Sequence, residues 1–344
     1  MLFSQAVAVH FDRILDDETR VYMGTVDPFW TIGSVPHGGY LLGCILEAVI
    51  HSQSTTGQPD PIHLSSHFLA ASRPGAYEIR ISRVRTGRQF SNLIAHFFQN
   101  NQINITSHVI VGTLAPAVMT NDRSCLTIIP PHPFAIRTPF RQHPSMSDPD
   151  QLPSILAFRS QLRASFDRIV EERSHAKANA PQEGNGCFDY GAWYEILGED
   201  KGSRLSMPAV AFLADLGRNA PGILPKCDRP ISPWYPTLTL AIEFKVKLSS
   251  LPACTAPRTF GVFSTGRFIH QGRHDAQAEI WTAPCAIGEK RKRELGSGTE
   301  EWRDKMLCVA IARQMALTST VGVNKRLARE QAPCQTRGNR AAHL

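Results

Sequence analysis

The chain has 344 residues, which is enough for two domains of ordinary size or for one large domain. A hydrophobic fraction of 42% supports folded cores, and a charged fraction of 19% excludes a largely disordered chain. The net charge of +7 is compatible with an anionic ligand or with nucleic acid, but a solvated surface with some excess lysine and arginine explains it more simply.

The eight cysteines are spread along the chain, with no pair at CxxC spacing and no Cys/His group at the spacing of zinc ligands. They are typical of reduced, intracellular thiols, and we expect no metal site. The N-terminus lacks the basic start and the long apolar core of a secretory signal. The charge-free stretch 29–46 contains Pro36 and several glycines and makes a poor membrane span. We therefore expect a soluble, cytoplasmic protein.

Residues 1–114 form the first predicted unit. The segment that follows Pro36 is apolar nearly all round, which predicts a buried helix. Strand-like runs separated by polar turns come next, at 63–70, 76–84, 90–99 and 103–114. A buried helix followed by consecutive strands predicts an antiparallel sheet wrapped around that helix, an α+β arrangement.

The rest of the chain repeats this plan after an interruption. Residues 115–186 are rich in proline, serine and aspartate and predict a surface connector with a helix over 154–174. Residues 187–324 form the second unit, in which the order of elements predicts an internal duplication. Its strands are expected at 188–197, 237–248, 259–270, 276–284 and 306–318, and its helix at 206–220. The basic, polar tail 325–344 is expected to be disordered.

Two strands of the second unit carry information on their faces. Strict alternation from 237 onward places Thr237, Thr239 and Ala241 on one face and the larger apolar residues on the other. In the last strand, Gln314 shares a face with small residues only, namely Cys308, Ala310, Ala312 and Ala316. Such a face leaves room for a packed helix or for an acyl chain.

Two basic features could be read as address signals. The run from Lys290 to Arg293 would suit nucleic acid, but no aromatic residues accompany it, and a solvated hairpin loop is the simpler interpretation. We therefore expect no nucleic-acid partner. The last three residues, Ala342, His343 and Leu344, form a variant of the small–basic–Leu peroxisomal address, which keeps peroxisomal import open beside the cytoplasm.

Common catalytic motifs do not occur in the sequence. There is no G-x-S-x-G nucleophile elbow, no P-loop, no dinucleotide fingerprint and no HExxH metal motif. If the protein is an enzyme, it is expected to work without a cofactor, a metal or an obvious nucleophile.

Three segments of the second half resemble the active-site segments of the acyl-CoA thioesterase II family, whose fold is a double hot-dog. The segment 208–216 resembles the family's helix that ends in an Ala/Ser-Asp pair, which places the family's aspartate on Asp215. The segment 236–246 resembles its Thr/Ser-Leu-Asp-His strand, which places the hydroxyl on Thr237. The segment 307–317 resembles its Val-Ala-Ser-x-x-Gln-Glu-Gly strand, which places the glutamine on Gln314.

The first half resembles the same family, in its fungal thioesterase-like branch, through the segments 35–43, 66–75 and 84–92. The resemblance implies two helix-wrapped antiparallel sheets fused in one chain. The sequence also departs from the family's pattern. Thr239 and Leu240 stand where the family has Asp-His, Met315-Ala316 replaces Glu-Gly, and 286–301 looks like an insertion.

The chemistry implied by the resemblance is thioester hydrolysis, which needs a positioned water and a group that accepts its proton. A buried carboxylate at Asp215 could accept the proton, while Thr237 and Gln314 hold the water. Backbone N–H groups at a helix start could stabilise the oxyanion. Taken one at a time, each of these three residues could equally be an ordinary helix, strand or core residue.

The first half offers a rival site, because His37, Gly38 and Gly39 begin the buried helix and Glu47 follows on it. Single hot-dog thioesterases use a similar arrangement, although the glycines could simply allow tight helix packing while His37 caps the helix or lines a cavity. We assign His37, Gly38 and Gly39 to substrate binding. His67, Arg85 and Arg88 are candidates for contacts with CoA phosphates.

The leading hypothesis is a cofactor-free acyl-CoA thioesterase in fatty acid or fungal secondary metabolism. One alternative is a lyase, an enoyl-CoA hydratase or dehydratase, and another is a non-catalytic acyl-binding protein in a biosynthetic pathway. The partner is expected to be the acyl-CoA substrate. A homodimer is an open expectation, because an exposed sheet edge tends to pair.

Overall fold

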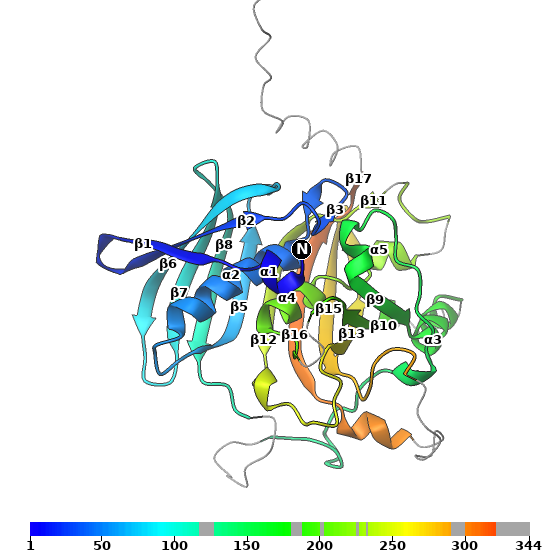
Figure 1. The fold of residues 1–344 in the computed structure, drawn as a ribbon. Coiled ribbons are helices and arrows are strands. Elements are labelled where there is room, and N and C mark those ends of the chain that lie inside the picture. The colour runs from blue at the N-terminus through cyan, green and yellow to red at the C-terminus, as the bar shows by residue number, and fades with distance from the viewer. Residues whose placement is uncertain are drawn as a thin grey trace, which may run out of the picture.

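The computed structural model describes residues 1–116, 127–179, 188–199, 203–224, 227–231, 233–289 and 300–320. Its main feature is one curved sheet of 13 strands that runs through both halves of the chain (Figure 1). Every strand pair in this sheet is antiparallel. The strand order is β1-β2-β6-β7-β8-β5-β12-β16-β15-β13-β10-β9, with β14 paired to β15.

The first half contains one long helix and most of its strands follow that helix. Its elements are α1 Phe3–Ala6, β1 His10–Leu15, β2 Thr19–Val26, β3 Thr31–Ile32, β4 Val35–Pro36, α2 Gly38–Gln53, β5 Asp60–Phe68, β6 Gly75–Thr86, β7 Ser91–Gln99 and β8 Gln102–Gly112. The four strands predicted after the helix are therefore confirmed as β5 to β8, each displaced by a few residues at most.

The second half is built in the same way. Its elements are β9 Leu162–Phe166, α3 Arg168–Asn179, β10 Phe188–Ile196, α4 Met207–Ala214, α5 Ala220–Ile223, β11 Pro233–Trp234, β12 Thr237–Phe244, β13 Thr259–Gly266, β14 Ile269–His270, β15 Arg273–Thr282, β16 Cys308–Leu317 and β17 Ser319–Thr320. Among these, β11 pairs with β17 in a separate two-stranded sheet.

The predicted duplication is visible in the strand order. In the first half the strand before the helix and the four strands after it lie in the order β2-β6-β7-β8-β5. In the second half the equivalent strands lie in the order β10-β13-β15-β16-β12. The two halves meet where β5 pairs with β12, so the two expected sheets are joined edge to edge. This is the double hot-dog, α+β architecture that the sequence predicted.

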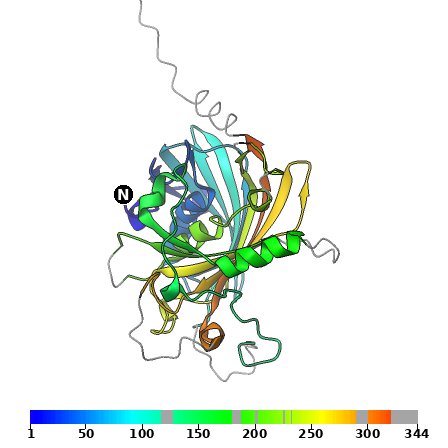
Figure 2. The same cartoon turned by 90° about the vertical axis from the view of Figure 1, so that its right-hand side faces the viewer.

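Helices α2 and α4 lie on the same face of the sheet and pack against each other (Figures 1 and 2). They run antiparallel, because Gly39 approaches Phe212 near the end of α4 whereas Gly43, one turn later, approaches Pro208 near its start. A Cβ on Gly39 would lie 2.5 Å from the carbonyl oxygen of Ala211. Glycine is required there because no larger residue allows the two backbones to come so close.

The core between the sheet and these helices is rich in aromatic side chains. Trp30 stacks on Phe158 with ring centroids 5.6 Å apart, and its ring edge meets Phe212 at 5.3 Å. All three side chains are fully buried. Phe158 comes from the segment expected to be a surface connector, so that segment contributes to the core that surrounds the start of α2.

The helix predicted over 154–174 is wrong in its first part. A short 3-10 helix, Ala157–Gln161, leads into strand β9, which pairs with β10 at the end of the sheet. Helix α3 begins only at Arg168. Leu162, Ala164 and Ser165 are buried in this strand while Arg163 is only partly buried, and the polar composition of the run hides its strand character in the sequence.

The helix predicted over 206–220 is shorter than expected, because α4 ends at Ala214 and α5 is a separate turn. The tail, its last three residues and the run from Lys290 to Arg293 lie outside the described residues. Within the described part of the chain, no helix is both long enough and apolar enough to cross a lipid bilayer.

Candidate active site

Asp215 lies at the C-terminal end of α4. Ser206 caps the start of this helix, since its hydroxyl accepts a hydrogen bond from the backbone N–H of Ala209, and Pro208 lies in the first turn. Seven of its eight residues are buried, so the chain that leaves the helix at Asp215 stays inside the protein. The side chain of Asp215 is only 6% exposed. A carboxylate in such a place needs hydrogen-bond partners.

Those partners come from three separate elements. The backbone N–H of Gly39, on α2, donates to Oδ2 of Asp215 over 2.7 Å. The amide of Gln314, on β16, donates to Oδ1 over 2.6 Å, and the hydroxyl of Thr237, on β12, donates to the same oxygen over 3.3 Å. Gln314 also donates to the Thr237 hydroxyl over 2.7 Å. The carboxylate, hydroxyl and amide singled out in the sequence therefore converge on one another.

The contact with Gly39 ties the two halves of the chain together. His37 is the residue before α2, but its side chain makes no capping hydrogen bond. Asp215, from the other half of the chain, caps the helix instead, since its Oδ2 accepts a hydrogen bond from a backbone N–H in the first turn of α2. The N-terminus of a helix carries a partial positive charge and unpaired N–H groups, so it stabilises an anion there.

His37 lies against the same carboxylate. Its Nδ1 is 3.6 Å from Oδ2 of Asp215, and the side chain is 1% exposed. This nitrogen has no hydrogen-bond partner among the described residues. The ring is packed between Phe158 and Phe212, at centroid distances of 5.6 and 4.8 Å. Burial lowers the pKa of His37, which keeps the imidazole neutral at physiological pH.

Burial acts in the opposite sense on the carboxyl group. Desolvation raises the pKa of Asp215 above its ordinary value. The nearby imidazole of His37 and the N–H of Gly39 oppose that rise, as do the hydrogen bonds from Thr237 and Gln314. The net effect is a carboxyl group that holds its proton more tightly than an exposed aspartate does.

A β-bulge turns Thr237 toward the carboxylate. Thr237 is opposite Ala316, but Thr239 is opposite Met315, so one residue is extra between them. Thr237 therefore points to the helices while Thr239 points to the other face of the sheet. The prediction that Thr237, Thr239 and Ala241 share one face is wrong for Thr237, because a bulge interrupts strict alternation and leaves no clear mark in a single sequence.

Gln314 lies on a face of β16 that otherwise carries small residues, as the sequence predicted. It lies between Ala312 and Ala316, both buried, on the face of β16 that meets the helices. The small methyl groups leave space for its amide to reach Asp215 and Thr237.

The departures from the family's strand pattern lie away from this cluster. Thr239 faces the opposite side of the sheet, and Leu240 is fully buried in the core. Met315 is exposed. The recorded hydrogen-bond partners of Asp215 are other residues, namely Gly39, Thr237 and Gln314.

Of the remaining predicted site residues, one lies beside Asp215 and the others lie elsewhere in the structure. Gly38 lies at the cluster, since a Cβ on it would be 2.7 Å from Oδ2 of Asp215. His67 is exposed on the outer face of β5. Arg85 lies near the end of β6, and Arg88 lies in the turn that follows, where its carbonyl oxygen accepts a hydrogen bond from Gln58. The structure does not bring Arg85 and Arg88 near Asp215.

The rival site of the first half merges with this one. His37, Gly38 and Gly39 meet Asp215 rather than Glu47. Glu47 lies eight residues after Gly39 on α2, which is about 12 Å along a helix. Within the described part of the chain, no group of three His, Cys, Asp or Glu side chains is placed to hold a metal ion.

Comparison with known proteins now identifies the family. A model of the acyl-CoA thioesterase N-terminal domain matches residues 26–115, and a model of the acyl-CoA thioesterase C-terminal domain matches residues 141–284. The chain belongs to the acyl-CoA thioesterase II-like double hot-dog family. The second match begins well before β9, in agreement with the place of that strand in the sheet of the second half.

Two fungal proteins are similar to this chain in sequence. The ustilagic acid biosynthesis cluster protein orf2 of Mycosarcoma maydis is 24% identical over 268 residues, which are 68% of this chain and 69% of that protein. The thioesterase-like protein TwmA of Talaromyces wortmannii is 33% identical over 156 residues, 43% of this chain and 42% of that protein.

Solved structures agree on the fold. A hot-dog protein of unknown function from Alicyclobacillus acidocaldarius aligns with 92% of this chain and 98% of its own, at 15% identity and a TM-score of 0.62. The acyl-CoA thioesterase II TesB2 of Mycobacterium marinum covers the same shares, at 15% identity and a TM-score of 0.57.

Proposed function

We propose that the protein hydrolyses an acyl-CoA thioester to a free carboxylic acid and CoA. The observation that carries the proposal is the convergence of the Asp215 carboxylate with the Thr237 hydroxyl and the Gln314 amide in a buried place. Membership of the acyl-CoA thioesterase family supports it. Because the two fungal relatives include a protein of a biosynthesis cluster, we propose an acyl-CoA of fungal secondary metabolism as the substrate.

In the proposed reaction Asp215 is the general base. It takes a proton from a water held by Thr237 and Gln314, and the water oxygen attacks the thioester carbonyl carbon. The C–S bond breaks when the tetrahedral intermediate collapses, and the proton on Asp215 passes to the leaving thiolate. The raised pKa of Asp215 makes it a better proton acceptor than an exposed carboxylate.

The negative charge that develops on the carbonyl oxygen in the tetrahedral intermediate needs hydrogen-bond donors other than the N–H of Gly39. The N–H of Gly39 is engaged by Asp215, so it fixes the base instead of the oxyanion. The other N–H groups in the first turn of α2 have no partners within the helix. Like the N–H of Gly39, they point out of the N-terminal end of α2. We propose that they stabilise the oxyanion.

Free thiol released from acyl-CoAs of varied chain length tests this function. A hydrolase releases one thiol for each acid formed. A hydratase would change the acyl group and leave the thioester intact, and an acyl-binding protein would do neither. The proposal fails if purified protein binds acyl-CoAs across the series and no thiol appears.

Replacing the hydroxyl group tests the role of Thr237. Thr237→Val keeps the shape of the side chain but removes the bonds to Asp215 and Gln314. The loss of about 0.5–1.5 kcal/mol should lower kcat by about two- to tenfold with little change in KM. Thr25→Val, at an exposed strand threonine of the first half, is the matched control and should leave the kinetics unchanged. Equal kcat values for the two variants would remove Thr237 from the mechanism.

The pH dependence tests the role of Asp215. Only the ionised carboxylate can accept a proton, so kcat/KM should fall as the pH drops through the pKa of this group. Because burial raises that pKa, the acidic limb should have its midpoint above the value of about 4 of a free aspartate. A rate profile measured from acid to neutral pH gives the midpoint, and a midpoint at or below that value would argue against a buried base.

A further inference from the structure

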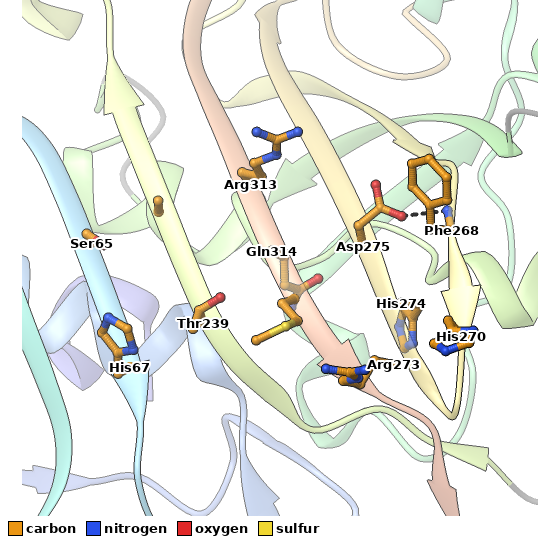
Figure 3. A pocket seen from close by; sticks show the side chains of 12 residues that line it. Ser65, His67, Thr239, Phe268, His270, Arg273, His274, Asp275, Arg313 and Gln314 are labelled. Carbon is orange, nitrogen blue, oxygen red and sulfur yellow. Dashed lines mark hydrogen bonds between the residues drawn. The ribbon is translucent and has the colours of Figure 1, made fainter.

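A hollow lies on the outer face of the sheet, opposite the helices (Figure 3). Its volume is about 490 Å³, within the range of small-molecule sites. The strands β5, β12, β16 and β15 form its floor and the hairpin that contains β14 forms one side. Thr239 and Met315, which the bulge and the alternation turn away from the core, belong to its lining.

The pocket is positively charged. Arg273 and Arg313 line it, and both are exposed. Within the described residues, no hydrogen bond or ion pair joins either guanidinium group to another side chain or to the backbone. His67 and His270 add further nitrogen donors. The one carboxylate in the lining is Asp275, and its Oδ1 accepts hydrogen bonds from two backbone N–H groups of the neighbouring hairpin.

An aromatic ring is fixed at the rim of the pocket. Phe268 is 72% exposed. Its backbone N–H donates to Oδ1 of Asp275 over 2.7 Å, and the N–H of Arg267 donates to the same oxygen over 3.1 Å. These bonds hold the hairpin against β15 (Figure 3). An exposed phenylalanine on a restrained hairpin offers a flat surface on which a planar ring can stack.

Two unpaired guanidinium groups and a free aromatic face are the features that recognise a phosphorylated nucleotide. Guanidinium groups bind phosphate oxygens through paired hydrogen bonds, and they do so best when no protein carboxylate competes. A base can stack on the phenyl ring at the same time. The combination distinguishes this pocket from an apolar groove.

The pocket also lies close to the candidate active site. Arg273 is opposite Leu317 on β16, three residues beyond Gln314, which is about 10 Å along a strand. Gln314 itself belongs to both places, since its amide reaches Asp215 on one face while its strand lines the pocket on the other. The paired strands β11 and β17 continue β12 and β16 at this end, so a long flexible substrate that occupied both places would pass beside this short ladder.

We propose that this pocket binds the nucleotide end of the thioester substrate, the adenosine 3′,5′-bisphosphate part of CoA. Arg273 and Arg313 contact its phosphates, Phe268 stacks on its base, and the pantetheine arm leads to Asp215. The inference rests on the proposed function and gives the CoA phosphates a different place from Arg85 and Arg88. A free nucleotide has the same chemistry, and the test separates the two sources.

Binding is measured first, without any hydrolysis. Calorimetric titration of the full chain with adenosine 3′,5′-bisphosphate should show one site, and the double variant Arg273→Gln/Arg313→Gln should weaken it by about tenfold or more. Arg267→Gln is the matched control, because Arg267 is an exposed arginine of the same hairpin that does not line the pocket. Phe268→Ala, a second variant that leaves the charges intact, should weaken binding several-fold.

Kinetics then identify the source of the nucleotide. With acyl-CoA the double variant should raise KM and leave kcat near its original value, and with the same acyl group on pantetheine it should change neither. A loss of nucleotide binding with an unchanged KM for acyl-CoA would overturn the assignment to the substrate.

Two other outcomes would overturn the whole proposal. One is a wild-type chain that does not bind the nucleotide, as expected if a second copy of the chain covers this face. The other is equal binding by the wild type and the double variant. A chain that binds the nucleotide but releases no thiol would contradict the proposed hydrolysis and leave the pocket standing.

Discussion

The Asp215→Asn variant is expected to lose about 10²- to 10⁴-fold in kcat/KM, because that is the usual contribution of a positioned general base. The asparagine keeps the size of the side chain and can still accept the hydrogen bond from Gly39, so the junction between α2 and α4 should survive. What it cannot do is take a proton from water. Thiol release at saturating and limiting acyl-CoA measures the loss.

Asp167→Asn is the matched control for that experiment. Asp167 is also a buried carboxylate that accepts backbone hydrogen bonds, from Arg141 and Gln142, but it lies at the start of α3. Its replacement should leave kcat/KM within about twofold of the wild type, since it touches no group of the proposed site. Equal losses in the two variants would show that the effect of Asp215→Asn is structural.

The same substitution should change stability in a pH-dependent way. The raised pKa of Asp215 means that folding favours its protonated form, so its stabilising contribution is present at low pH and is lost as the pH rises through the folded-state value. At neutral pH the Asn variant should therefore be more stable than the wild type, and the difference should shrink on acidification. Thermal unfolding across this pH range gives the comparison. A difference that grows toward acid would contradict a raised pKa.

The Gly39→Ala variant is expected to be destabilised by about 3 kcal/mol, at the upper end of the usual cost of overpacking. The new Cβ would lie 2.5 Å from the carbonyl oxygen of Ala211 and 2.8 Å from Cβ of Asp215. Both atoms are held by helix α4, so neither can move away as the tip of a flexible side chain could. The helices should separate, and activity should fall because Asp215 moves with them.

Chemical denaturation measures the free energy of unfolding. For a chain of this length that unfolds as one unit, the melting temperature should drop by roughly 4 °C. Gly57→Ala serves as the control, because a Cβ at Gly57 has nothing within 4 Å. If both alanine variants unfold at the same denaturant concentration as the wild type, the close approach of α2 and α4 is not needed for the fold.

Much of the fold could be predicted because its signals are local. The helix after Pro36 is apolar all round, and the four strands that follow it are separated by polar turns, so pattern alone places both. The duplication follows from the repeated order of elements, and the strand order in the sheet confirms it. Strand β9 escaped prediction because an edge strand with charged neighbours reads like a surface helix.

The candidate site could be predicted only in part. Asp215 and Gln314 stand out by resemblance, but the orientation of Thr237 depends on a bulge that is set by pairing with β16. The contact of His37 with Asp215 depends on how two helices 170 residues apart in the chain pack together, and sequence periodicity does not report such packing. The pocket with Arg273 and Arg313 depends on four strands that lie side by side only in the folded sheet.

A single-turnover reaction in water enriched in ¹⁸O tests the central claim most directly. Excess enzyme is mixed with acyl-CoA. The released thiol is quantified, and the isotope content of the free acid is determined by mass spectrometry. If Asp215 activates a water, each thiol is matched by one acid that carries a single ¹⁸O atom, and Asp215→Asn yields neither product on the same timescale. Acid without the label would mean that a protein oxygen attacked the thioester, and intact thioester in the wild-type reaction would mean that the cluster around Asp215 does not hydrolyse it.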